Sequence, residues 1–139
     1  MHQDNELIIA TLVPETERLD TADQHFGIRY PLVVEPMVYR FTEQLAQGYS
    51  GGYWHFYRLS NGSFYMAPNL DKPFKIVADN GFAGSMSADA LGITACLYTF
   101  SNLSFNAGNF GESCGRHYHW LLDFAMQHPE AAAIRAAID

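Results

Sequence analysis

The 139-residue chain is long enough for one domain, spanning 1–139, with its own hydrophobic core. Hydrophobic residues make up 48% of it and charged residues 17%, a balance that is typical of globular proteins and excludes a disordered chain. The net charge of −7 excludes the basic footprint expected of a nucleic-acid-binding protein.

The acidic excess does not predict a mimic of DNA. Such a mimic needs carboxylates spaced like phosphates, roughly one charge per 1.7 Å of duplex axis. The 15 acidic residues are spread along the chain without an acidic run. The sequence therefore favours an ordinary acidic globular protein.

Cysteine usage and the N-terminus indicate a cytoplasmic protein. Cys96 and Cys114 are most simply explained as small buried residues in a reduced protein. Residues 1–6 are polar, are expected to be loose, and lack the basic start and apolar run of a signal peptide. No contact with a membrane is expected.

The first third of the chain predicts one extended segment and two helices. Residues 7–13 form a short apolar run suited to an edge strand or an arm packed on the core. Residues 15–26 are expected to form a short helix anchored by Leu19 and Phe26. Residues 35–47 predict a clearer helix that begins at Pro36. Its apolar stripe contains Val38, Phe41 and Leu45.

Asn61-Gly62 between two aromatic runs, 53–59 and 64–67, predicts a hairpin with a two-residue type I′ turn. In that register Leu59 faces Phe64 and Arg58 faces Tyr65. The expected core face carries Tyr53, His55, Tyr57, Leu59, Phe64 and Met66. The opposite face is unusually aromatic and carries Trp54, Phe56, Arg58 and Tyr65.

Further strands at 74–79 and 82–86, joined by a second Asn-Gly pair, extend the hairpin into an antiparallel meander of three to four strands. Residues 87–109 then predict a long central helix that is apolar nearly all round and therefore buried. Ser87 is its expected N-cap. Gly92, inside the helix, indicates close approach of another backbone, because glycine there otherwise costs about 1 kcal/mol.

Two more helices complete the predicted fold. Helix 114–127 places Cys114 and His117 on its core face and His119 in solvent, and helix 130–138 is anchored by Ile134 and Ile138. The predicted fold class is α+β: a meander of three to four antiparallel strands packed against a long buried central helix and several further helices, in a single domain.

The candidate chemical clusters are weak. Cys114, His117 and His119 cannot converge on one metal ion, because His119 points about 140° from Cys114 on the same helix. Histidines elsewhere could act as general bases, but no nucleophile elbow or phosphate loop accompanies them. We therefore expect no metal, no cofactor and no enzymatic activity; a small hydrolase or metalloprotein is the weakest alternative.

The aromatic hairpin face is the strongest candidate for a binding surface, because Trp, Tyr and Arg are enriched at interaction hot spots. The N-terminal arm or a helix could equally cover that face. An aromatic sheet can also stack single-stranded bases, but this alternative needs a basic surround that the net charge does not supply.

The chain contains a series of short motifs in a fixed order: Ala10-Thr-Leu-Val-Pro14, Gln24-His-Phe-Gly27, Tyr49-Ser-Gly-Gly-Tyr-Trp54, Phe64-Tyr-Met-Ala-Pro68, Gly92-Ile-Thr-Ala-Cys96 and His128-Pro-Glu130. This ordered set resembles the plasmid-borne antirestriction family of the ArdB/KlcA type. The resemblance covers nearly the whole chain and implies non-enzymatic inhibition of type I restriction–modification systems, without DNA mimicry.

The resemblance implies a partner, the type I restriction–modification complex or an associated host protein, and no stable DNA binding. Our hypothesis is a protein-level contact that blocks cleavage, or the translocation preceding it, and spares methylation. The family supplies no catalytic residues. As an interaction patch we predict Tyr49, Trp54 and Arg58, with Glu35 and Arg18 as polar companions. The alternative is that Trp54 belongs to the core and Tyr49 anchors a loop.

Overall fold

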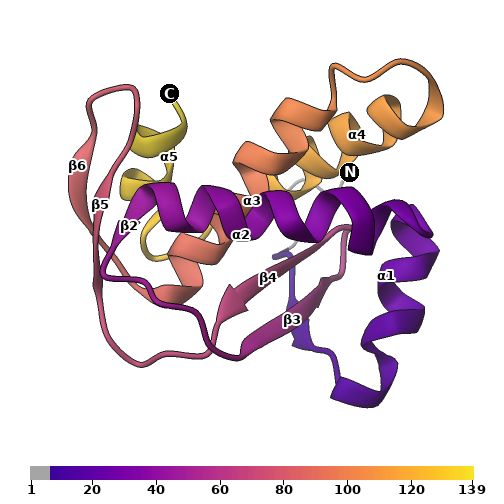
Figure 1. Ribbon diagram of the computed structural model, residues 1–139, viewed down its shortest axis with the longest axis horizontal. Helices are drawn as coiled ribbons and strands as arrows, with labels where there is room; N and C mark the ends of the chain where they lie inside the picture. The colour runs from indigo at the N-terminus through magenta and orange to yellow at the C-terminus, as the bar shows by residue number, and fades with distance from the viewer. Residues whose placement is uncertain (1–6) are drawn as a thin grey trace.

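The computed structural model describes residues 7–139, so the expected loose segment 1–6 lies outside the described residues. The first strand is followed by helical segments as far as α2, then by the strands β2 to β6, and then by the helices α3 to α5 (Figure 1). Their bounds are β1 Ala10–Leu12, the 3₁₀ turn η2 Glu15–Glu17, α1 Arg18–Phe26, the π-helical segment η3 Tyr30–Val34, α2 Glu35–Leu45, β2 Ala46–Gln47, β3 Trp54–Leu59, β4 Phe64–Pro68, β5 Phe74–Val77, β6 Ala83–Met86, α3 Ala88–Leu103, α4 Gly108–Ala125 and α5 Ala131–Ile138.

The α+β class is confirmed, with the strands divided between two antiparallel sheets instead of running through one. One sheet has the order β1-β3-β4 and the other β2-β5-β6. The expected edge strand in 7–13 is confirmed as β1, which pairs with β3. In Figure 1 the β5–β6 hairpin stands at the left, the β3–β4 hairpin lies at the bottom, and α1 closes the right side.

Helix α3 is the buried centre of the molecule, and it packs against α2, α4, α5 and β4. Ser87 is confirmed as its N-cap, because the side-chain oxygen accepts from the Ala90 amide at 3.1 Å. Gly92 marks the expected close approach: a Cβ there would lie 2.5 Å from Ala67 Cα. Cys96 Sγ donates to the Met66 carbonyl at 3.8 Å. Helix α3 thereby covers the outer edge of β4, an edge that would otherwise expose unpaired backbone groups.

The predicted extent of the central helix, 87–109, is wrong at its C-terminal end. The helix ends at Leu103, and α4 begins at Gly108, before the expected start at 114. Side chains end it: Asn106 Nδ2 donates to the Leu103 carbonyl at 3.0 Å and Ser104 Oγ donates to the Ser101 carbonyl at 2.6 Å. Such bonds offer backbone carbonyls an alternative to helix. Phe105 consequently projects into solvent.

The expected hairpin register is wrong by one residue. Phe64 lies opposite Arg58 instead of Leu59, and Tyr65 lies opposite Tyr57. The loop is longer than two residues, because the Leu59 amide donates to the Ser63 carbonyl at 2.9 Å and the Gly62 amide donates to the Leu59 carbonyl at 3.1 Å. No described non-glycine residue adopts the positive φ that a type I′ turn requires of its first central residue, and Gly62 alone in this turn does so at φ 108°.

The assignment of core and outer faces on β3 is also wrong. Trp54 and Phe56 are buried at 6% and 4% exposure, whereas Tyr53 is 47% exposed. Phe56 stacks on Phe64 with ring centroids 4.8 Å apart, which places both in the core. Because side chains alternate along a strand, the one-residue error in register put Trp54 and Phe56 on the wrong face. Leu59, Phe64 and Met66, which were also expected in the core, are each at most 2% exposed, so that part of the prediction is confirmed.

Candidate functional site

A cleft of about 240 Å³ lies between α1, the start of α2 and strand β3. Arg18 enters it from α1, Glu35 from α2 and Trp54 from β3. The structure thus brings together three residues that the sequence predicted for one interaction patch. Tyr30 and Tyr39 complete its aromatic wall.

Glu35 occupies the first position of α2, directly after the π-helical segment η3, and its backbone amide donates to the Tyr30 carbonyl. Its Oε2 accepts hydrogen bonds from the hydroxyls of Tyr30 at 3.4 Å and Tyr39 at 3.3 Å. Burial, and then the neighbouring Glu35 carboxylate, raise the pKa of Tyr30 and Tyr39 above their ordinary value. Both hydroxyls therefore stay protonated and hold the carboxylate in place in the cleft.

Trp54 forms a wall of the cleft through a buried indole. Its Nε1–H donates to the Tyr49 hydroxyl at 2.7 Å, and its ring meets Tyr39 edge to face at 5.1 Å. Tyr49 is therefore joined to the cleft through Trp54 and fixes the loop before β3. In this structure Trp54 is a core residue and Tyr49 anchors a loop, which are the structural roles that the sequence left open.

Arg18 lies at the rim, with its guanidinium carbon 4.7 Å from the centre of the Tyr53 ring. Its Nε is buried and finds no hydrogen-bond acceptor among the described residues. The Tyr53 hydroxyl in turn donates to Glu15 Oε2 at 3.3 Å. The rim thus connects the 3₁₀ turn, α1 and the start of β3.

Arg58, the remaining residue of the predicted patch, does not reach the cleft. Its Nη2 donates to Thr21 Oγ1 at 3.2 Å and lies 3.9 Å from Glu17 Oε1. Both partners lie outside the cleft lining, so Arg58 ties β3 to the start of α1.

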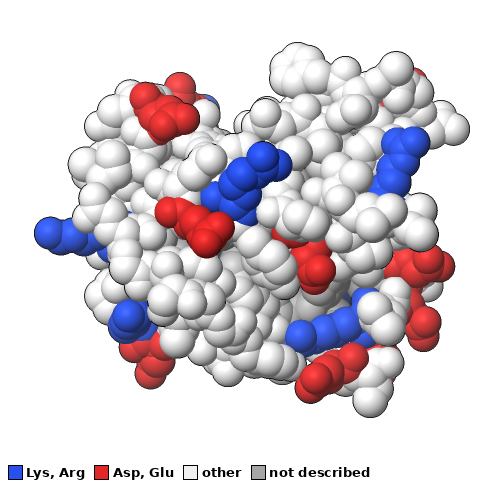
Figure 2. Space-filling model, viewed as in Figure 1, with Lys and Arg blue, Asp and Glu red and all other residues white. Residues whose placement is uncertain are grey.

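The sequence missed a second set of exposed residues beside this cleft. Leu19, expected as a core anchor, is 83% exposed, and Ile28 is 72% exposed. Both line a groove of about 440 Å³ that shares Tyr30 and Glu35 with the cleft. Figure 2 shows acidic side chains over and beside α1 at the right of the view. The signal in the sequence was the charged neighbours Arg18 and Asp20, which are typical of an exposed position.

The buried pair Ser63 and His117 bears on the hydrolase alternative. Ser63 Oγ lies 2.8 Å from His117 Nδ1, but the two residues are 0% and 3% exposed. A substrate cannot reach that hydroxyl. The rings of His25, Phe64 and Phe100 surround His117, and it belongs to the core as the sequence predicted. Cys114 is likewise buried.

The His117 environment predicts acid sensitivity. Burial, then His25 and Arg116, lower the pKa of His117 to about 3, far below the ordinary value near 6.5 of the unfolded chain. Between these values only the unfolded chain binds this proton. The contribution of neutral His117 to the free energy of unfolding is therefore fully present above about pH 6.5 and is lost as the pH falls toward 3. In that range the free energy of unfolding falls by at most about 1.4 kcal/mol per pH unit because of this group.

Urea unfolding of wild type and His117→Gln between pH 6.5 and 4.5 checks this expectation. The variant should show a shallower fall in the free energy of unfolding, whereas the exposed-site control His119→Gln should follow wild type. Equal slopes for wild type and His117→Gln would contradict a neutral buried His117.

His128, another candidate base, has both ring nitrogens engaged. Its Nδ1 accepts from the Glu130 amide at 3.0 Å, which leaves Nε2 to donate to Asp89 Oδ2 at 2.9 Å. Asp89 also accepts from the Tyr65 hydroxyl at 2.8 Å. This arrangement holds the start of α5 against the start of α3 and leaves no nitrogen for proton transfer.

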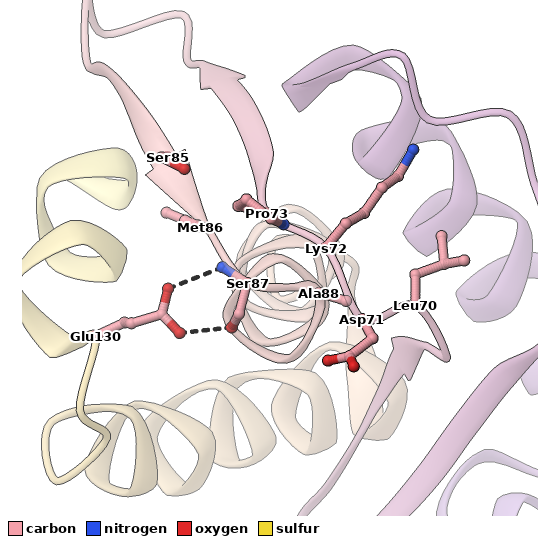
Figure 3. A pocket seen from close by; sticks show the side chains of 9 residues that line it. All are labelled: Leu70, Asp71, Lys72, Pro73, Ser85, Met86, Ser87, Ala88 and Glu130. Atoms are coloured by element: carbon pink, nitrogen blue, oxygen red, sulfur yellow. Dashed lines mark hydrogen bonds between the residues drawn. The ribbon is translucent and has the colours of Figure 1, made fainter.

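Glu130 completes the same clamp beside an open depression of about 390 Å³ (Figure 3). Its carboxylate accepts from the Ser87 amide at 2.9 Å and from Ser87 Oγ at 2.5 Å, as the dashed lines show. Lys72 points away from this carboxylate in Figure 3 and lies 5.4 Å from the Phe74 ring centre. The His-Pro-Glu motif therefore fixes the N-terminus of the central helix.

The aromatic face proposed for base stacking is buried. Trp54, Phe56 and Tyr65 are at most 6% exposed. Tyr65 is covered by Phe124, whose ring stacks on it at 5.7 Å. On the face shown in Figure 2, Lys and Arg side chains are scattered among acidic ones and form no basic patch.

Residues 7–139 contain neither a cluster of metal ligands nor a helix suited to spanning a membrane. Within this range no three His, Cys, Asp or Glu side chains come together as ligands for a metal ion. The helices in the same range are also too short or too polar to cross a membrane.

A match to the family model for antirestriction proteins over residues 47–139 places this fold in the antirestriction class. The KlcA antirestriction protein of Escherichia coli is 43% identical over an alignment of 142 residues that covers the whole of both chains. YafX of Escherichia coli K12 is 38% identical over 95% of this chain and 88% of its own length. The chain belongs to the antirestriction protein family, as its motifs indicated.

A solved structure from work on the KlcA and ArdB proteins has the same fold. Its TM-score is 0.90 with 42% identity, and the match covers the whole of both chains. That work describes a novel fold, with antirestriction activity against type I DNA restriction systems in vivo but not in vitro.

Proposed function

We propose that this protein protects unmodified DNA from type I restriction inside the cell by contacting a protein, without catalysis and without imitating DNA. The observation that carries the proposal is full-length similarity in sequence and fold to proteins with that activity in vivo. Their inactivity in vitro is expected of a protein whose target or helper is present only in the cell. The target is the restriction complex itself or a host protein associated with it.

The cleft supports a contact-based mechanism. Its aromatic wall, the carboxylate of Glu35 and the cation of Arg18 are the kinds of group that form interaction hot spots. In the described part of the chain, the buried Ser63 and the doubly bonded His128 do not offer a catalytic group to solvent. Trp54, which is hydrogen-bonded to Tyr49, packs against Tyr39 of the cleft wall. Arg58 connects β3 to α1 through its hydrogen bond to Thr21.

The plating efficiency of unmodified phage on a type I restricting host tests the proposal. Expression of this protein is expected to raise phage survival on the restricting host and to change nothing on a host without the restriction enzyme. Unchanged survival, with the protein present in soluble folded form, would contradict the proposal.

A further inference from the structure

The groove beside the cleft combines apolar side chains with negative charge. It has a volume of about 440 Å³, and its charged lining residues are Asp20, Asp23 and Glu35. No lysine or arginine lines it among residues 7–139. Its apolar contribution comes chiefly from Leu19 and Ile28. A surface of this composition attracts cations and repels phosphates.

The aliphatic side chains at this groove are unusually exposed. Leu19 is 83% exposed, Ile28 72%, and the neighbouring Leu32 68%. Single exposed aliphatic residues are common on protein surfaces, whereas several grouped around one groove are typical of an interaction surface. The nearby Tyr30, by contrast, is only 7% exposed.

The backbone holds this surface in a fixed shape. Gly27 ends α1 with φ 57°, a conformation that favours glycine, and the chain reverses there into η3. Tyr30 then enters the core, where its hydroxyl lies 3.1 Å from Met66 Sδ and its ring meets Phe56 edge to face. Ile28 is left outside. A surface that is ordered before binding loses little conformational entropy on binding.

We propose that this groove, formed by Leu19, Asp20, Asp23, Ile28, Tyr30 and Glu35, binds a basic amphipathic segment of the partner protein. The inference rests on the proposed function, because it names the chemistry of the protein that is contacted. The long stem of a partner lysine or arginine packs on Leu19 and Ile28 while its charged head reaches the carboxylates. Apolar side chains of the same segment cover the remaining exposed surface.

Charge and polarity changes at exposed positions test the groove in the phage plating assay. Leu19→Glu removes the apolar contact and Asp23→Lys reverses one charge. Because both side chains project into solvent, the substitutions should leave the melting temperature near that of wild type. Loss of one hot-spot contact weakens binding about tenfold, so phage protection should fall by about the same factor.

Matched controls lie at the opposite end of the molecule and in the 69–73 loop. Val77→Glu on β5 introduces the same change as Leu19→Glu at an exposed aliphatic residue, and Asp71→Lys repeats the charge reversal. Both controls should protect as wild type does. If the groove variants also protect fully, the groove inference fails and the proposed function stands. If wild type itself gives no protection, both fail.

A photo-crosslinking residue, p-benzoylphenylalanine, identifies the occupant directly. It is placed at position 28, or at position 77 as the control, and the restricting cells are irradiated. The result expected is attachment to one protein through a peptide that carries lysine or arginine beside apolar residues, lost when Asp23→Lys is added. Attachment to nucleic acid, to a second copy of this chain or to an acidic peptide, or no attachment, would overturn the inference.

Discussion

Replacing Trp54 by alanine is expected to lower the free energy of unfolding by about 3–5 kcal/mol, the range measured for large buried aromatic residues. The indole is 6% exposed and packs edge to face on Tyr39. Its removal leaves a cavity beside the core and deprives the Tyr49 hydroxyl of the donor at 2.7 Å. Chemical denaturation of wild type and variant measures the change.

The neighbouring residue supplies the control for this substitution. Tyr53 is on the same hairpin but 47% exposed, and its ring contacts the Arg18 guanidinium. Tyr53→Ala should therefore cost only about 1 kcal/mol, the scale of an exposed cation–π contact. Equal effects at positions 53 and 54 would contradict the face assignment on β3. A loss of activity in Trp54→Ala would report unfolding, so the exposed Leu19 is the better probe of function.

Replacing Gly92 by alanine is expected to destabilise the protein by about 3 kcal/mol, although alanine is the better helix former. The new Cβ would lie 2.5 Å from Ala67 Cα and would also meet the Met66 carbonyl oxygen. Helix α3 and strand β4 would have to separate, and overpacking of this kind costs about 1–3 kcal/mol or more. The separation would also break the Cys96 contact with β4.

Gly115 in α4 is the matched control, because a Cβ there would meet only Ser104 Cβ at 3.8 Å, an ordinary contact. Gly115→Ala should therefore stabilise the protein by about 1 kcal/mol through helix propensity alone. Thermal and urea unfolding of the two variants should move in opposite directions. Stabilisation by both substitutions would contradict the close packing of α3 on β4.

Capping residues, prolines and glycines in the sequence were sufficient to predict where α2 and α3 begin and that α3 is buried. Ser87, followed by a run without charge after Asp89, indicated the start and the burial of α3, and both are confirmed. Pro36 indicated the start of α2, which begins one residue earlier. Gly92 indicated the backbone contact because glycine within a buried helix needs a packing reason.

The β3–β4 hairpin was predicted, but its turn and register could not be, because the contact that sets them is distant in the sequence. Asn61-Gly62 alone favours a two-residue turn. In the structure Asn61 Nδ2 donates to the Trp120 carbonyl at 2.8 Å, a partner 59 residues away, and Gly62 packs against the Trp120 ring. This tertiary contact selects the longer loop. The shift in register then places Phe56, instead of Tyr57, opposite Met66 on the core side of the hairpin.

The sequence predicted part of the candidate site correctly. Tyr49 and Trp54 lie in one motif and are hydrogen-bonded to each other, and Trp54 contributes to the cleft that Arg18 and Glu35 enter. Leu19 was misplaced because helical spacing alone does not say whether an apolar residue faces the core. The packing that exposes Leu19 depends on the turn at Gly27, where α1 gives way to η3.

The modification state of phage that survive in restricting cells tests the central claim most directly. A contact that blocks cleavage or translocation but spares methylation should give surviving progeny that carry the host modification and plate fully on a second restricting culture. A protein that displaces DNA from the restriction complex would also block methylation. Surviving progeny that remain unmodified, and are restricted again, would contradict the account.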